Sequence, residues 1–217
     1  MAQDEVSLYN LALSSAGARS SISHPDERSR EAEICRLWYP AVRRQILRAA
    51  PWSVSKAVSR LAQLAERTEN EWVTGLPHPE YRFAYGLPEN FLHPRYLASY
   101  ARFEISLLST TQRALNTNDV QTILYYTVDQ PLISIWDPDL YLAIAMALSA
   151  YICLPLSGKV GQARNAQQQA NALILQARET AANESYDLLD SSLDILQASG
   201  SSRYIYPAGP MIAVPNV

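Results

Sequence analysis

The sequence predicts an α+β protein, mainly α, with a helical bundle body, a small antiparallel β insertion and an extended C-terminal tail. Apolar residues recur at helical spacing over residues 1–73 and 137–198. Short alternating runs rich in tyrosine and proline occupy residues 74–136, which favours strands and turns there. Residues 199–217 are rich in Ser, Gly and Pro, and they lack a periodic pattern. We therefore expect one domain over 1–217 made of these parts.

The first part of the chain predicts three helices. A short helix runs from Asp4 to Ala16, and a long one begins with Ser23 as its N-cap and ends at Pro51. Pro40 removes one backbone hydrogen bond inside the long helix, so we expect a kink there. Trp52 is expected to pack into the corner that follows. The core stripe of the long helix is predicted as Ile34, Trp38, Val42, Ile46 and Ala49, and a third helical pattern reads Val54, Val58, Leu61 and Leu64.

The tyrosine-rich middle predicts an antiparallel sheet. The run 120–129 alternates, so that Leu124 and Tyr126 point one way while Ile123 and Tyr125 point the other. Residues 116–119 provide turn chemistry before this strand.

Helices return after residue 136. Asp137 and Pro138 are typical of a helix start, and no charged side chain lies between Asp139 and Lys159. This run is interrupted by Pro155, is rich in alanine and lacks basic residues before it, so we interpret it as a buried central helix rather than a membrane span. The residues predicted to be buried are Leu140, Ile144, Ala147, Leu148 and Tyr151. A further helix at 159–182 presents Ala163, Ala166, Ala170, Leu173, Ile174 and Ala177 on one face, and an amphipathic helix is predicted at 184–198.

Charge is distributed unevenly along the chain. The net charge is -3, which disfavours a protein that gathers nucleic acid by long-range attraction. Residues 36–60 nevertheless contain six basic side chains and no acid, whereas the C-terminal half is acidic. These six residues are Arg36, Arg43, Arg44, Arg48, Lys56 and Arg60. They form either a solvated helix face or a surface for a negatively charged partner. Cys35 and Cys153 are predicted to be buried, reduced thiols.

No catalytic, metal-binding or cofactor-binding constellation emerges from the sequence. All three histidines precede proline and none is paired at metal-ligand spacing. The Ser-Gly-Lys at 157–159 lacks the first glycine of a phosphate-binding loop. Asp187, Asp190 and Asp194 share a predicted helix face and are interpreted as solvated carboxylates. The first residues carry two acids and no apolar run, so they do not resemble a signal peptide. We expect a protein that is not an enzyme and needs no cofactor.

The order of motifs resembles a known family. The stretch LYNLALSSAGARSSISHPDERSREAEICRLWYPAVRRQILRAAPW carries a short helix, a Gly-containing turn, an acidic helix start, Cys-x-x-x-Tyr, paired arginines and Pro-Trp. It is followed by YRFAYGLPENFL, by a tyrosine-rich strand ending in Val-Asp, and by an alanine-rich helix before Pro-Leu-Ser. Over residues 5–182 this succession is similar to the tail tubular protein A family, the head-to-tail adaptors of short-tailed phages.

The resemblance implies a structural virion protein in the neck of the tail, made in the host cytoplasm. It implies a twelve-membered ring between the portal protein and the tail nozzle (tail tubular protein B), through which double-stranded DNA passes without being read. The six basic residues then become candidates for a subunit interface or the channel. Alternatives that stay open are another neck component, such as a stopper or head-completion protein, and a helical DNA-binding protein that uses the 36–60 face.

The end of the chain has a hypothesis of its own. An exposed apolar segment that orders on a partner is a recurring mode of recognition. We expect the tail to dock on the portal through Arg203, Tyr204, Ile205, Tyr206, Met211 and Ile212.

Overall fold

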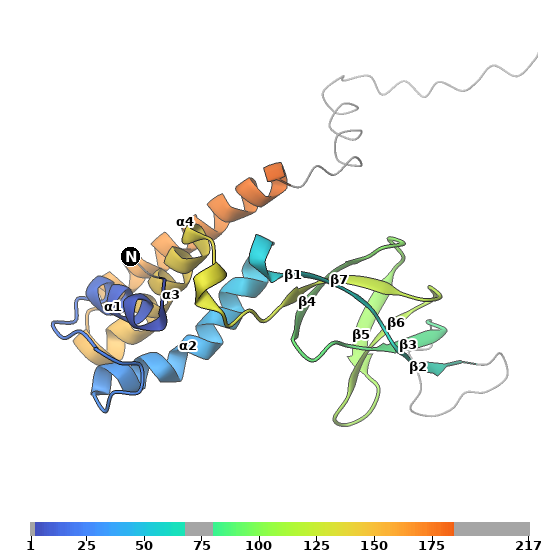
Figure 1. Cartoon of the computed structure of the whole chain (residues 1–217), viewed down its shortest axis with the longest axis horizontal. Helices are drawn as coiled ribbons and strands as arrows, with labels where there is room; N and C mark the ends of the chain where they lie inside the picture. Colours follow the sequence, from blue (N-terminus) through green and yellow to red (C-terminus); the bar gives the residue numbers. More distant parts are fainter. Residues whose placement is uncertain (1–2, 68–79, 185–217) are drawn as a thin grey trace, which may run out of the picture. The chain divides into compact units, whose positions relative to one another are not determined.

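The computed structural model shows a mixed α+β protein and describes residues 3–67 and 80–184 (Figure 1). Met1–Ala181 form one compact unit, and Ala182–Val217 form a second. Within the second unit only residues 182–184 are described, as the end of a helix. The predicted helix at 184–198 and the tail at 199–217 therefore lie outside the described residues.

The described residues form four helices and seven strands. The helices are α1 (Glu5–Ser15), α2 (Arg30–Ala49), α3 (Pro138–Ser157) and α4 (Val160–Glu184), with 3₁₀ turns η1 (Ser53–Ser55) and η2 (Ile133–Ile135). The strands are β1 (Lys56–Arg60), β2 (Gln63–Glu66), β3 (Phe83–Gly86), β4 (Phe91–Leu97), β5 (Phe103–Leu107), β6 (Arg113–Thr117) and β7 (Ile123–Val128). All seven described strands thus lie between α2 and α3 in the sequence.

The helix starts differ from the prediction at one point. As predicted, α1 begins after Asp4, whose carboxylate accepts a hydrogen bond from the Ser7 amide at 2.7 Å. The second helix begins at Arg30 instead of near Ser23, and Ser29 is its N-cap. The Glu27 carboxylate accepts a hydrogen bond from the Ser23 amide, which holds the preceding residues in a turn. The helix then continues across Pro40 to Ala49.

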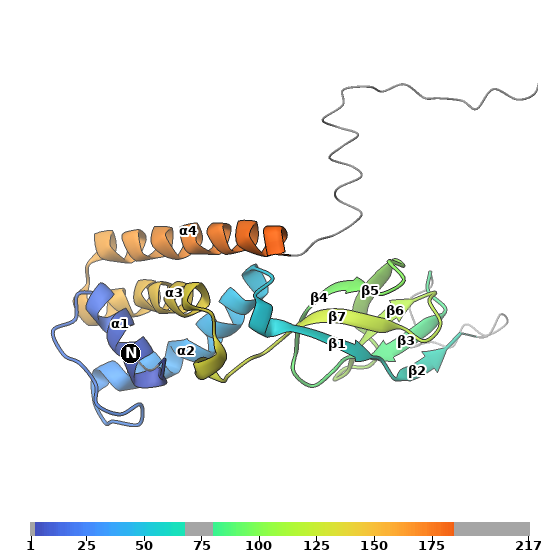
Figure 2. The same cartoon turned by 45° about the horizontal axis from the view of Figure 1, so that its top comes forward.

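The helical core is centred on α3, which packs against α1 and α2. Figure 2 shows α4 running alongside α3, and the small side chains Ala170 and Ala177 of α4 enter the same core. Four of the five side chains predicted to be buried in α3 are buried, and Tyr151 is half-buried. This helix is long and apolar enough to cross a membrane, but 56% of its most apolar window is buried inside the protein, as expected of a core helix.

Trp38 was predicted to lie in the core of α2, and that prediction is wrong. Its side chain is 36% exposed and stacks on Tyr151 of α3 at 5.0 Å between ring centroids. The buried face of α2 is instead centred on Cys35 and Tyr39, one position further along. Trp52 does fill the corner after α2, where its indole N–H donates to the Ile46 carbonyl at 2.8 Å.

Two antiparallel sheets replace the single small sheet that was predicted. Sheet A has the order β1-β7-β4, and sheet B has the order β2-β3-β6-β5. Strands β1 and β2 lie where the third helical pattern, Val54 to Leu64, was predicted, so that prediction is also wrong. Residues 56–60 instead alternate between exposed and half-buried side chains while pairing with β7.

A second apolar core lies among the strands of both sheets. It contains Leu97, Leu124 and Tyr126 from sheet A, together with Tyr85 and Leu115 from sheet B. Leu124 and Tyr126 point inward and Ile123 and Tyr125 do not, as the alternation in the sequence predicts. Residues 116 and 117, predicted as turn, end strand β6. Both cysteines are buried and unpaired, as predicted.

Candidate interaction surface

Two of the six predicted basic residues form ion pairs within the chain. Arg43 donates from Nε and Nη2 to the two carboxylate oxygens of Asp129, at 3.0 and 2.9 Å. Arg44 donates from Nε to the same carboxylate at 2.9 Å. Asp129 directly follows β7, so these contacts tie the middle of α2 to the end of sheet A. We call Arg43, Arg44 and Asp129 the clasp.

The electrostatics of the clasp favour the charged carboxylate. Burial works to raise the pKa of Asp129, but hydrogen bonds from Arg43 and Arg44 outweigh it and hold the pKa below its usual value. The Arg43 guanidinium also lies 5.5 Å from the centre of the Tyr39 ring. Burial raises the pKa of Tyr39 to about 12, against the opposing effect of Arg43. The clasp is therefore anchored in the helical core.

The other four basic residues do not form one surface. Arg36 lies 3.5 Å from Asp26, and Arg48 is exposed further along α2. Arg48 also contributes, after burial, to lowering the pKa of His93 on β4. Lys56 and Arg60 instead belong to strand β1, where both are exposed. The predicted row of basic side chains is thus divided between a helix and a sheet.

Lys56 and Arg60 share the outward side of sheet A with a group of tyrosines. Val58 lies opposite Tyr125 in the register of β1 and β7, and Tyr125 lies opposite Tyr96 in that of β7 and β4. Side chains directly opposite each other on paired strands point to the same side of the sheet. The ring of Tyr96 stacks on those of Tyr125 and Tyr100, at centroid distances of 4.6 and 5.5 Å. This surface, the tyrosine face, comprises Lys56, Val58, Arg60, Tyr96, Tyr100, Ile123 and Tyr125.

The tyrosine face is both apolar and positively charged. Val58 is 56% exposed and Tyr100 is 60% exposed, and they belong to a group of exposed apolar side chains on one side of the sheet. Strands β1, β4 and β7 contain no aspartate or glutamate, whereas they contain Lys56, Arg60 and Arg95. A cavity of about 410 Å³ borders Tyr96 and Tyr100 and is also lined by Arg95 and Arg102. The surface therefore suits an apolar partner that carries negative charge.

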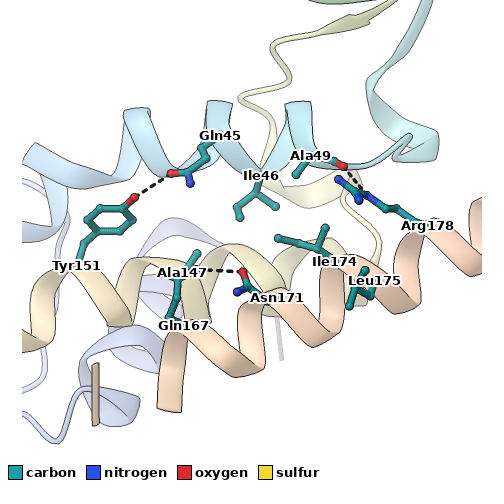
Figure 3. A pocket seen from close by; sticks show the side chains of 10 residues that line it. All are labelled: Gln45, Ile46, Ala49, Ala147, Tyr151, Gln167, Asn171, Ile174, Leu175 and Arg178. Atoms are coloured by element: carbon teal, nitrogen blue, oxygen red, sulfur yellow. Dashed lines mark hydrogen bonds between the residues drawn. The ribbon is translucent and has the colours of Figure 1, made fainter. Parts of the chain in front are cut away.

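A groove on the helical side offers less chemistry (Figure 3). It lies between α2, α3 and α4, has a volume of about 320 Å³, and is lined by Gln45, Ile46, Tyr151, Asn171, Arg178 and others. The Tyr151 hydroxyl donates to Gln45, and Arg178 donates to the Ala49 carbonyl at 2.8 Å. None of its lining residues is a carboxylate, histidine or cysteine. Among its lining side chains Tyr151 is of a type used in acid–base catalysis, and its hydroxyl donates to Gln45 Oε1 at 3.0 Å.

Other predicted site residues are placed as follows. Within residues 3–67 and 80–184, no three His, Cys, Asp or Glu side chains gather as metal ligands. The six tail residues predicted to bind the portal, and Asp187, Asp190 and Asp194, lie outside the described residues.

The tyrosine face was not predicted from the sequence. The alternation in β7 placed Tyr125 and Ile123 on one side, but Val58 was assigned to a helix, so its pairing with Tyr125 could not be inferred. The chain matches no model of a known protein family and no curated protein.

Proposed function

We propose that this chain is a non-enzymatic structural protein of the virion, the head-to-tail adaptor of a short-tailed phage. One observation carries the proposal: the tyrosine face gathers exposed apolar side chains on one side of sheet A, and surfaces where such side chains gather mark sites of protein assembly. The order of motifs over residues 5–182 supplies the particular class of assembly.

A ring places a specific demand on each subunit. A closed ring needs two different surfaces per subunit, which repeat around one rotation axis. Exposed tyrosines supply large contact area at interfaces, and charges around them favour one partner and one register. Lys56 and Arg60 supply such charges beside Tyr96 and Tyr125. In the proposed twelve-membered ring, the tyrosine face is one of the two surfaces.

The parts of the chain take distinct roles in this proposal. The four helices form a bundle that is the body of the subunit, the two sheets are its β insertion, and residues 199–217 extend to the portal protein. The tail nozzle (tail tubular protein B) binds the ring on its other side, and double-stranded DNA passes through the centre. Arg43 and Arg44 stabilise the subunit itself, because both donate hydrogen bonds to the Asp129 carboxylate. The remaining candidates for the subunit interface or the channel are Arg36, Arg48, Lys56 and Arg60.

The alternative of a DNA-binding helical face has less support. A DNA-binding helical face would need the six basic residues on one surface. Arg43 and Arg44 are instead paired with Asp129, and Lys56 and Arg60 lie on a strand. Another neck component remains the nearer rival, since it would share the fold and the need for assembly.

The decisive experiment mixes the purified chain with a purified portal ring and images the product by electron microscopy. A ring of this chain added to one end of the portal is the expected result. Size-exclusion chromatography with light scattering, with and without DNA, provides the comparison. The proposal would be overturned if the chain did not bind the portal but its elution volume changed with DNA in a salt-dependent way.

A second arm tests the tail. Deleting residues 200–217 is expected to weaken binding to the portal while leaving the circular dichroism spectrum of the rest of the chain unchanged. Unchanged portal binding would remove the tail from the interface.

A further inference from the structure

We infer that the tyrosine face of one subunit binds the acidic segment, residues 179–196, of a second copy of this chain. The inference rests on the proposed ring, because it names the contact that joins neighbouring subunits. Residues 185–196 lie outside the part of the chain that the structure describes, so only their sequence supports the inference.

Charge identifies the two surfaces as complementary. The acidic segment carries Glu179, Glu184, Asp187, Asp190 and Asp194, and no basic residue lies between Arg178 and Arg203. The tyrosine face carries the exposed cations Lys56 and Arg60, and the strands of sheet A contain no aspartate or glutamate. Opposite charges at the edge of an interface steer encounter and fix the register.

The apolar parts also correspond. The segment interleaves its acids with Leu188, Leu189, Leu193, Ile195 and Leu196. The tyrosine face offers Val58, Ile123 and the tyrosine rings, all partly open to solvent. An apolar helix or strand edged with carboxylates matches a surface whose centre is aromatic and whose border is basic.

Ring geometry favours a protein over a nucleic acid as the occupant. Single-stranded nucleic acid binds by stacking its bases on free aromatic ring faces. On this surface Tyr96 already stacks on two other tyrosines, with interplanar angles of 5° and 17°. The ring of Tyr96 is therefore covered by its two neighbours, and bases could stack only on the outer rings, Tyr100 and Tyr125, so this surface offers few stacking sites to a nucleic acid.

A second copy, rather than the same chain, follows from the requirements of a ring. The tyrosine face and the acidic segment are different surfaces, so binding one to the other between copies generates a head-to-tail contact, which forms a ring when the rotation from copy to copy closes. Binding within one chain would consume both surfaces and leave nothing to join neighbours.

The chain provides a sharp chemical test, because Lys56 and Lys159 are its only lysines. Light and heavy-isotope-labelled full-length chains are mixed in equal amounts at low ionic strength and treated with a carbodiimide, which joins lysine to carboxylate at contact distance. The expected product joins Lys56 to Asp187, Asp190 or Asp194, with mixed-isotope pairs as frequent as same-isotope pairs. Products of one isotope only, or no product at Lys56, would overturn the inference. Lys159, outside the tyrosine face, reports the background.

A charge exchange gives an independent test. One variant carries Lys56→Glu and Arg60→Glu, and the other carries Asp187→Lys, Asp190→Lys and Asp194→Lys. Each alone should self-associate at least about tenfold more weakly, a loss of about 1.4 kcal/mol, because like charges then face each other across the contact. Mixing the two should restore association in sedimentation velocity, because each variant then meets an opposite charge. Failure of the mixture to associate, with both variants folded by circular dichroism, would contradict the inference.

The two proposals fail in different ways. If the chain forms a ring on the portal but the exchanged charges change nothing, the adaptor function stands and the named contact is wrong. If the Lys56 cross-link forms between copies but the chain does not bind the portal, the contact stands and the adaptor function is wrong.

Discussion

Arg43 donates two parallel hydrogen bonds to Asp129, at 3.0 and 2.9 Å, and so joins the middle of α2 to the residue that ends β7. The two side chains are only 12% and 15% exposed, whereas Arg44, the second donor, is 58% exposed. Bidentate arginine–carboxylate contacts fix the orientation of the two groups as well as their distance. The helical and sheet regions of the first unit are thereby held together by side chains far apart in the sequence.

The difference in exposure between the two arginines leads to a prediction about stability. Arg43→Ala leaves a poorly solvated carboxylate without its main partner, and we expect it to lower the free energy of unfolding by about 1.5 to 3 kcal/mol. Arg44→Ala removes an exposed partner and should cost less than about 1 kcal/mol. Urea denaturation followed by circular dichroism measures both. Equal losses for the two variants would contradict the assignment of Arg43 as the principal partner.

The clasp also predicts how stability depends on pH. The pKa of Asp129 is lower in the folded chain than its usual 3.8, so the unfolded chain binds more protons between these two values. The contribution of Asp129 is therefore complete above its usual pKa and is lost as the pH falls towards the folded pKa. We expect the unfolding free energy of the natural chain to fall more steeply below about pH 4 than that of Asp129→Asn. Asp139→Asn, a change at an exposed carboxylate, is the control and should follow the natural chain.

Two glycines on either side of a helix boundary form a matched pair. Gly158 ends α3 in the left-handed conformation, with φ of +65°, and its amide donates to the Leu154 carbonyl. Gly158→Ala should destabilise the chain by about 1 kcal/mol, because a Cβ disfavours this conformation. Gly161 lies inside α4, where an added Cβ meets no atom within 4 Å, so Gly161→Ala should be neutral or stabilising by up to about 1 kcal/mol. We expect the melting temperature to fall for Gly158→Ala and to stay the same or rise for Gly161→Ala. Equal changes in the two melting temperatures would contradict this prediction.

Local sequence patterns predicted α3 and α4 well but missed strands β1 and β2, where a third helix was predicted. α3 and α4 have long, regular apolar patterns, and both formed with the buried faces expected from them. The pattern Val54, Val58, Leu61 also fits a helix, yet residues 56–60 pair with residues 123–127. That pairing is set by contacts distant in sequence, which no local periodicity reports.

The interaction surface was only partly predictable for the same reason. The basic residues at 36–60 could be found by composition, but their division between helix and sheet depends on where α2 ends. Nothing in the sequence paired Asp129 with Arg43, since the two are brought together by the return of β7 to the helices. Trp38 was misplaced because a tryptophan near an apolar stripe is buried by default, and here it stacks on Tyr151 at the surface instead.

The uncharged helix α3 supports a last prediction about the whole fold. Ile144 is fully buried among α1, α2 and α3, and an aspartate there would be a charge without solvent or partner. The cost is expected to exceed about 4 kcal/mol, which is comparable with the entire stability of many domains, so Ile144→Asp should fail to fold. Leu154→Asp places the same charge at a side chain of α3 that is 56% exposed, and it should change stability by less than about 1 kcal/mol. Expression, circular dichroism and light scattering of the two variants distinguish burial inside the protein from exposure to a bilayer. A folded, assembling Ile144→Asp chain would show that α3 is not the centre of the helical core.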